Sequence, residues 1–88
     1  MIISVIDARY AGDYRVWLRF SDGLTGEIDL EDELWGEVFE PLKEKQEFSK
    51  LRADKELDTI VWPNGADFAP EFLYQRLKQT GQGLSAAE

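Results

Sequence analysis

Apolar and polar positions alternate over the first third of the chain. Between residues 14 and 20 one set of alternate side chains is wholly apolar, and this period of two predicts a strand with one buried face. The apolar set is Tyr14, Val16, Leu18 and Phe20, and the residues between them are Arg15, Trp17 and Arg19. Residues 24–30 alternate again after a short polar turn, which predicts a hairpin. Because residues 2–8 are rich in β-branched side chains, we expect three antiparallel strands here.

The pattern changes after the second of these alternating runs. The acidic residues at 29–32 are typical of a helix start, and Pro41 interrupts any long helix. We therefore expect only short helical pieces over residues 30–48. Two further short strands, residues 50–54 and 58–62, are predicted to form a second hairpin.

The last predicted element is an amphipathic helix over residues 68–79. Its apolar side chains recur every four positions and include Leu73 and Leu77. Asp67 stands ahead of it as a natural N-cap, and Pro70 is tolerated in a first helical turn. The order β-β-β-α-β-β-α predicts an α+β fold, an antiparallel sheet with the C-terminal helix packed on one face.

The length of the chain, 88 residues, is that of one domain. We expect residues 1–79 to form a single α+β domain and the small, polar residues 80–88 to form a flexible C-terminal tail. The chain opens without a basic stretch, and no apolar run approaches the roughly 20 residues of a membrane span. The sequence therefore predicts a cytoplasmic protein with no membrane association.

Composition narrows the chemistry that is available. The chain has 18 acidic and 10 basic residues, and its net charge of −8 disfavours direct binding to a nucleic-acid backbone. It has no Cys and no His, so it lacks thiolates and the commonest general base and metal ligand. We expect no catalytic residues, no metal and no cofactor, and therefore a protein that is not an enzyme.

The most distinctive stretch runs from Val61 to Tyr74 and contains the sequence Trp-Pro-Asn-Gly-Ala-Asp. Together with the Phe-Ser-Asp-Gly turn at residues 20–23 and the Pro-Leu…Phe spacing of residues 41–48, it resembles a small prokaryotic family known as domain of unknown function 2442. The resemblance covers about residues 2–78. It implies a short α+β domain and offers no catalytic residue to transfer.

The resemblance also implies two settings for such a domain. Some members of that family are fused to a C-terminal helix-turn-helix domain, and others are encoded beside a second small protein in toxin–antitoxin-like pairs. Because this chain ends about ten residues after the shared region, we expect it not to read DNA as the fused members do.

The loop after Trp62 is the first candidate site. In one interpretation it presents Asn64 and Asp67 to a ligand, since loops on rigid scaffolds often carry function. In the other, which we favour, the Pro-Asn-Gly sequence makes the turn, Asp67 caps the helix and Trp62 anchors the loop in the core.

The second candidate is the acidic segment, residues 27–47, which holds nine acids and two lysines and so carries −7 of the net charge of −8. Its spacing is not that of a calcium-binding loop, and short surface helices rarely build a catalytic cleft. Two interpretations remain equal: a solvated surface, or a docking face for a basic protein partner. In the second, the docking residues are Glu31, Asp32 and Glu33.

The third candidate is the stripe of Arg15, Trp17 and Arg19 on one strand face. Such a stripe can grip an anionic ligand, stack bases, or anchor a protein partner. Alternatively, Trp17 is simply shielded by the neighbouring arginines.

Taken together, these patterns predict a non-catalytic protein-interaction or regulatory module, an antitoxin-like half of a two-protein system. The alternative is a small-molecule-binding domain that uses the sheet face or the loop after Trp62. Self-association into a homo-oligomer is left open.

Overall fold

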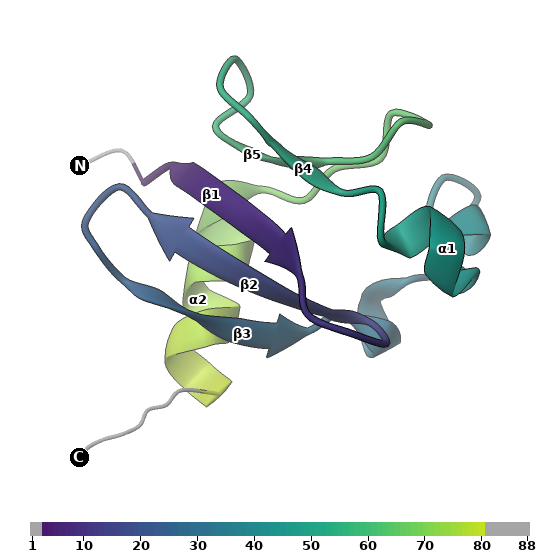
Figure 1. Ribbon diagram of the computed structural model, residues 1–88, viewed down its shortest axis with the longest axis horizontal. Coiled ribbons are helices and arrows are strands. Elements are labelled where there is room, and N and C mark those ends of the chain that lie inside the picture. The colour runs from purple at the N-terminus through teal and green to yellow at the C-terminus, as the bar shows by residue number, and fades with distance from the viewer. Residues whose placement is uncertain (1–2, 81–88) are drawn as a thin grey trace.

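Two antiparallel sheets and an 11-residue C-terminal helix make up the protein, seen in a computed structural model that describes residues 3–80 (Figure 1). The first sheet has the order β1-β2-β3, with β1 (Val5–Tyr10), β2 (Arg15–Phe20) and β3 (Thr25–Asp29). The second pairs β4 (Arg52–Asp54) with β5 (Thr59–Val61). Along the chain, β3 is followed by two 3₁₀ helices, η1 (Glu31–Glu33) and η2 (Glu40–Lys43), and by the short helix α1 (Lys45–Phe48), which precedes β4. The last element, after β5, is α2 (Pro70–Thr80).

The predicted α+β class and element order are confirmed, including the short helical pieces between the hairpins. One refinement concerns the sheets, because the five strands divide into a three-stranded and a two-stranded sheet. The second hairpin lies beside β1, where the backbone N–H of Val5 donates to the carbonyl of Asp58 at 2.8 Å.

The core forms where β2 meets α2. Val16, Leu18 and Phe20 alternate along β2 and are fully buried, together with Leu73 and Leu77 of α2. This confirms the burial expected from the alternation. Tyr14 lies just before β2 and is only half-buried, although it also packs against the core.

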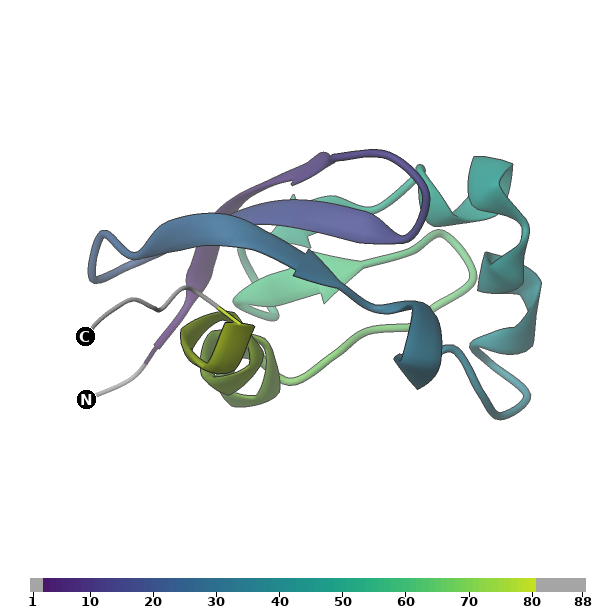
Figure 2. The same cartoon turned by 90° about the horizontal axis from the view of Figure 1, so that it is seen from below.

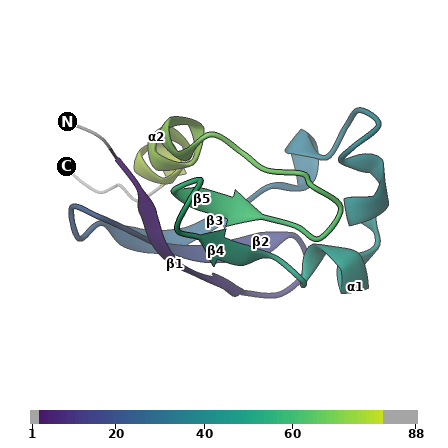
Figure 3. The same ribbon diagram turned by 90° about the horizontal axis from the view of Figure 1, so that it is seen from above.

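One layer of the molecule is the three-stranded sheet, and α2 packs on one of its faces (Figures 2 and 3). A glycine allows the close approach of the helix to β3. A Cβ atom at Gly26 would lie 2.6 Å from Cδ1 of Leu77, closer than real Cβ contacts. The opposite face of the sheet is therefore the one that the helix leaves open.

The helix start differs from the expectation. Asp67 is not the N-cap of α2, because the helix begins at Pro70, and Asp67 instead forms an isolated antiparallel bridge with Val61. Proline disfavours the helical conformation in the residue before it, while its own fixed φ suits a first helical turn. The backbone therefore stays extended beside β5 until Pro70.

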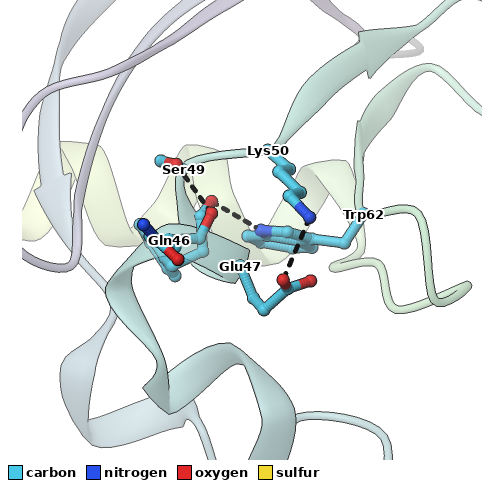
Figure 4. A network of polar contacts seen from close by, with 6 residues as sticks. Gln46, Glu47, Ser49, Lys50 and Trp62 are labelled. Atoms are coloured by element: carbon cyan, nitrogen blue, oxygen red, sulfur yellow. Dashed lines mark hydrogen bonds and ion pairs between the residues drawn. The ribbon is translucent and has the colours of Figure 1, made fainter.

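Trp62 anchors the following loop in the core, as expected, and is only 2% exposed. Its indole N–H donates to the carbonyl of Phe48 at 2.8 Å, which joins the end of β5 to α1 (Figure 4). Its ring lies between the rings of Phe48 and Phe68, at centroid distances of 5.6 and 5.8 Å. This aromatic row ties the short helices to the rest of the core.

Of the expected tail, only Thr80 belongs to the described part of the chain, where it ends α2; residues 81–88 lie outside it. Over residues 3–80, no helix combines the length and the apolar character needed to cross a bilayer.

Candidate functional site

The short helices of the acidic segment gather at one end of the molecule, opposite the β2–β3 turn (Figures 1 and 3). Both lysines of the segment are already paired. The Nζ atom of Lys43 lies 3.1 Å from a carboxylate oxygen of Glu40, and that of Lys45 lies 3.1 Å from Asp13. The hydrogen bond and charge of Lys45 lower the pKa of Asp13, and Asp13 in turn raises the pKa of Lys45.

The predicted docking residues divide into two kinds. Glu33 is half-buried, and its carboxylate lies 2.7 Å from a guanidinium nitrogen of Arg76, so it ties η1 to α2. Arg76 also donates to the carbonyl of Asp29 at 3.3 Å. Glu31 and Asp32 are exposed, and no cation of the described residues pairs with either carboxylate. Of the three predicted docking residues, only Glu31 and Asp32 therefore remain free to face a partner.

Glu31 and Asp32 also border a shallow hollow of about 310 Å³. Its lining residues are Tyr14, Glu31, Asp32, Leu34 and Lys43. The hydroxyl of Tyr14 donates to the backbone carbonyl of Lys43 and holds η2 against the start of β2. The hollow is therefore built between the acidic segment and the sheet.

Two exposed apolar side chains, Trp35 at 69% and Val38 at 43%, were not predicted as a site from the sequence. Trp35 lies immediately before, and Val38 within, a turn that begins at Gly36, whose φ of +91° favours glycine. The backbone N–H groups of Phe39 and Glu40 both donate to the carbonyl of Gly36, at 3.1 and 2.9 Å. The sequence could have indicated this exposure, because Trp35 belongs to no alternating run of apolar residues that would bury its side chain.

In the loop after Trp62, the side chain of Asn64 makes two hydrogen bonds within the chain. Its side-chain carbonyl accepts a hydrogen bond from the N–H of Ala66 at 3.1 Å, and its amide donates to the carbonyl of Val38 at 2.9 Å. The same residue therefore shapes its own turn and clamps the turn that carries Trp35. Asp67 is exposed, and its carboxylate takes part in no hydrogen bond or ion pair with the described residues. The polar groups of Asn64 are thus used within the chain, whereas the Asp67 carboxylate is not.

The stripe on β2 lies on the open face of the sheet, as the alternation predicts. Arg15 and Arg19 are exposed, whereas Trp17 is half-buried. The guanidinium of Arg9, from β1, lies 5.5 Å from the centroid of the Trp17 ring. Acidic residues neighbour the stripe, because Asp7 lies 3.9 Å from Arg19 and the β3 partners of Arg15 and Trp17 are acidic: Asp29 and Glu27. The open face is thus a mixed-charge surface with a partly covered indole.

Within the described range, no three His, Cys, Asp or Glu residues are grouped so that they could hold a metal ion. Comparison with known protein families places the chain. A family model described as a protein of unknown function (DUF2442) matches residues 5–79, from β1 almost to the end of α2. No curated protein and no solved structure matches the chain. Since the match spans both sheets, the acidic segment and the helix, the chain belongs to the DUF2442 family.

Proposed function

We propose that this protein is a non-catalytic interaction module that binds a basic protein partner through its acidic segment. The observation that carries the proposal is the uncompensated charge of that segment. Its two lysines are paired with carboxylates of the same chain, and the cations that reach it from outside pair with one acid each, Arg76 with Glu33 and Lys50 with Glu47. Exposed carboxylates such as Glu31 and Asp32 are left without a cation among the described residues.

Such a surface acts mainly on the rate of association. Charge complementarity steers a partner of opposite sign and raises the association rate, and it fixes orientation more than it adds affinity. The attraction between exposed charges is screened beyond about 8 Å at physiological ionic strength. The antitoxin-like role that the family resemblance implies is a narrower form of this function, in which the partner is the second protein of a pair.

The open face of the three-stranded sheet is a second surface for the same function. Trp and Arg are typical interface anchors, and Arg15 and Arg19 are exposed there. Two features count against it as the main contact, because the Arg9 guanidinium already lies over Trp17 and the neighbouring strands supply acidic residues.

Binding of a small molecule is the alternative function. The hollow bordered by Glu31 and Asp32 supports it, since a polar, cationic molecule would fit such a lining. The loop after Trp62 supports it less, because both polar groups of the Asn64 side chain are bonded within the chain.

The test is purification of the tagged protein from its native host, followed by binding kinetics with the partner that is recovered. The variant Glu31→Lys/Asp32→Lys is compared with Glu56→Lys/Glu71→Lys, which changes the net charge equally at exposed sites outside the acidic segment. We expect a basic partner whose association slows with salt and slows more for the first variant. An acidic or neutral partner, or equal effects of the two variants, would contradict the proposal.

A further inference from the structure

We propose that Trp35 and Val38 form the apolar anchor for a basic partner segment, and that Asn64 positions this anchor. The inference rests on the proposed function and names the contact that supplies the affinity for the basic partner. The anchor lies on the exposed turn between η1 and η2.

The exposure of Trp35 is the first observation. Trp62 is 2% exposed and makes a hydrogen bond with its indole N–H, whereas Trp35 is 69% exposed. When a partner covers a large aromatic side chain, apolar surface leaves water and the free energy of the complex falls. Tryptophan is accordingly among the residues enriched at binding hot spots. Val38, on the same turn, enlarges the apolar surface.

The second observation is that the turn is held at both ends. Leu34, immediately before Trp35, is buried in the core. Phe39, immediately after Val38, stacks on Phe68 with the ring centroids 4.8 Å apart. The exposed side chains therefore stand on a backbone that is already ordered. A preorganised anchor loses less conformational entropy on binding than a free loop would.

The third observation is the clamp that Asn64 provides. Its amide donates to the carbonyl of Val38, at the middle of the exposed turn. The orientation of that amide follows from its other bond, because the N–H of Ala66 requires the oxygen on its side. The Trp-Pro-Asn-Gly motif and the Trp35 turn, far apart in the sequence, are thus one structural unit.

Charge complementarity indicates what covers the anchor. Glu31, Asp32 and Glu37 lie close to Trp35 in the chain, are exposed, and pair with no cation of the described residues. A segment that presents Lys or Arg beside apolar side chains satisfies both features, and a cation can also lie on the indole face. A second copy of this chain is disfavoured, since each copy carries a net charge of −8.

The test uses a synthetic, fluorescein-labelled amphipathic peptide of Lys and Leu, with binding measured by fluorescence anisotropy. Trp35→Ala should weaken binding about tenfold, a loss typical of a hot-spot side chain. Trp35→Phe should retain most of the affinity. The matched control is Leu57→Ala, which removes an apolar side chain that is 54% exposed on the β4–β5 turn, and it should leave binding unchanged.

Asn64→Asp tests the clamp. It keeps the oxygen that accepts from Ala66 and removes the N–H that donates to Val38. Its extra negative charge would by itself strengthen binding to a basic peptide, so a several-fold loss would report the missing donor. Circular dichroism melts establish that each variant is folded.

Equal binding by the wild type and Trp35→Ala would overturn the anchor and leave a purely electrostatic contact, with the proposed function intact. Failure of the peptide to bind the wild type would overturn the anchor as well. The proposed function fails by a different result, the recovery from the native host of a partner that is insensitive to the Glu31 and Asp32 reversals. Unchanged binding by Asn64→Asp would remove the positioning role alone.

Discussion

The body of the molecule and its acidic segment are held together in different ways. In the body, antiparallel backbone ladders join β1, β2 and β3, with one register shift between Val5 and Asp7, and the apolar side chains of β2 on the core face are fully buried. In the acidic segment, Leu30, Leu34 and Leu42 also reach the core, but the short helices lack a backbone ladder and are further fixed by single polar contacts made from elsewhere in the chain. These contacts include the Tyr14 hydroxyl on Lys43, the Arg76–Glu33 pair and the Asn64 amide on Val38.

Because of this difference, we assign stability mainly to the body and recognition mainly to the acidic segment. Burial of apolar side chains is what stabilises a small domain, and the body contains most of it. The acidic segment adds little regular structure, yet it carries most of the net charge and the most exposed tryptophan. We therefore expect substitutions in the body to act on folding and substitutions on the surface of the acidic segment to act on binding.

The largest effect is expected in the body. Leu18→Ala removes a fully buried side chain and should reduce the free energy of unfolding by about 2–5 kcal/mol. Urea denaturation monitored by circular dichroism measures it. Thr25→Ala, on the open face of β3, is the control and should change stability by less than about 0.5 kcal/mol. Similar losses from the two substitutions would mean that the wrong face of the sheet has been assigned to the core.

A smaller effect is expected where α2 meets β3. Gly26→Ala would place a methyl group 2.6 Å from Leu77 Cδ1, and the resulting overpacking should cost about 1–3 kcal/mol. The double variant Gly26→Ala/Leu77→Ala tests the cause. If the clash is responsible, the cost of Gly26→Ala should shrink in the Leu77→Ala background. An unchanged cost there would point away from the helix.

The Arg76–Glu33 pair, one of the contacts that join the two regions, should contribute less again. A double-mutant cycle with Glu33→Gln and Arg76→Met should give a coupling energy of about 1 kcal/mol, because both side chains are half-buried and their charged atoms lie 2.7 Å apart. The matched cycle uses Glu47 and Lys50, which are more exposed and lie 3.0 Å apart on α1 and the turn after it. Its coupling should be about 0.3 kcal/mol. Equal coupling energies for the two pairs would show that the Arg76–Glu33 pair does not hold η1 more strongly than an ordinary surface ion pair would.

The smallest effect expected is a pH dependence of stability that arises within the body. The Tyr74 hydroxyl donates to the Asp22 carboxylate at 2.5 Å, which lowers the pKa of Asp22 and raises the pKa of Tyr74. The stability from this bond is fully present above the ordinary aspartate pKa of about 3.9, and it is lost as the pH falls through the lowered pKa. At alkaline pH it is lost as the pH rises through the raised pKa of Tyr74.

Urea titrations of the wild type and Tyr74→Phe at several pH values measure this effect. The two proteins should differ at pH 7 and converge in acid. Tyr10→Phe, an exposed tyrosine with no hydroxyl hydrogen bond to the described residues, is the control and should show no such convergence. A constant difference between wild type and Tyr74→Phe down to acid pH would show that ring packing, and not the hydrogen bond, accounts for it.

The two regions also differ in how far the sequence predicts them. The alternation of Val16, Leu18 and Phe20 reports burial directly, since side chains on a strand alternate between faces. The position of Trp35 depends on distant partners, above all the stacking of Phe39 on Phe68 and the bond from Asn64. No local periodicity encodes such contacts. The same limit applies to Glu33, whose charge looked free in the sequence and is paired with a residue of the last helix.

The misplaced start of α2 shows a local competition. Asp67 favours a helix cap, and Pro70 disfavours helical geometry in the residue before it. The bridge between Asp67 and Val61 adds a reason for the chain to remain extended. The proline and the strand pairing together outweigh the capping preference, and the helix begins at Pro70 instead of residue 68.

The three tryptophans offer the most direct test, since each reports on a different region through its indole N–H signal in a ¹H–¹⁵N NMR spectrum. Trp62 reports on the core, Trp17 on the open sheet face and Trp35 on the acidic segment. On titration with the basic partner recovered from the native host, the Trp35 signal should move most and the Trp62 signal should stay in place. A spectrum in which Trp17 moves and Trp35 does not would contradict the account and assign recognition to the sheet face.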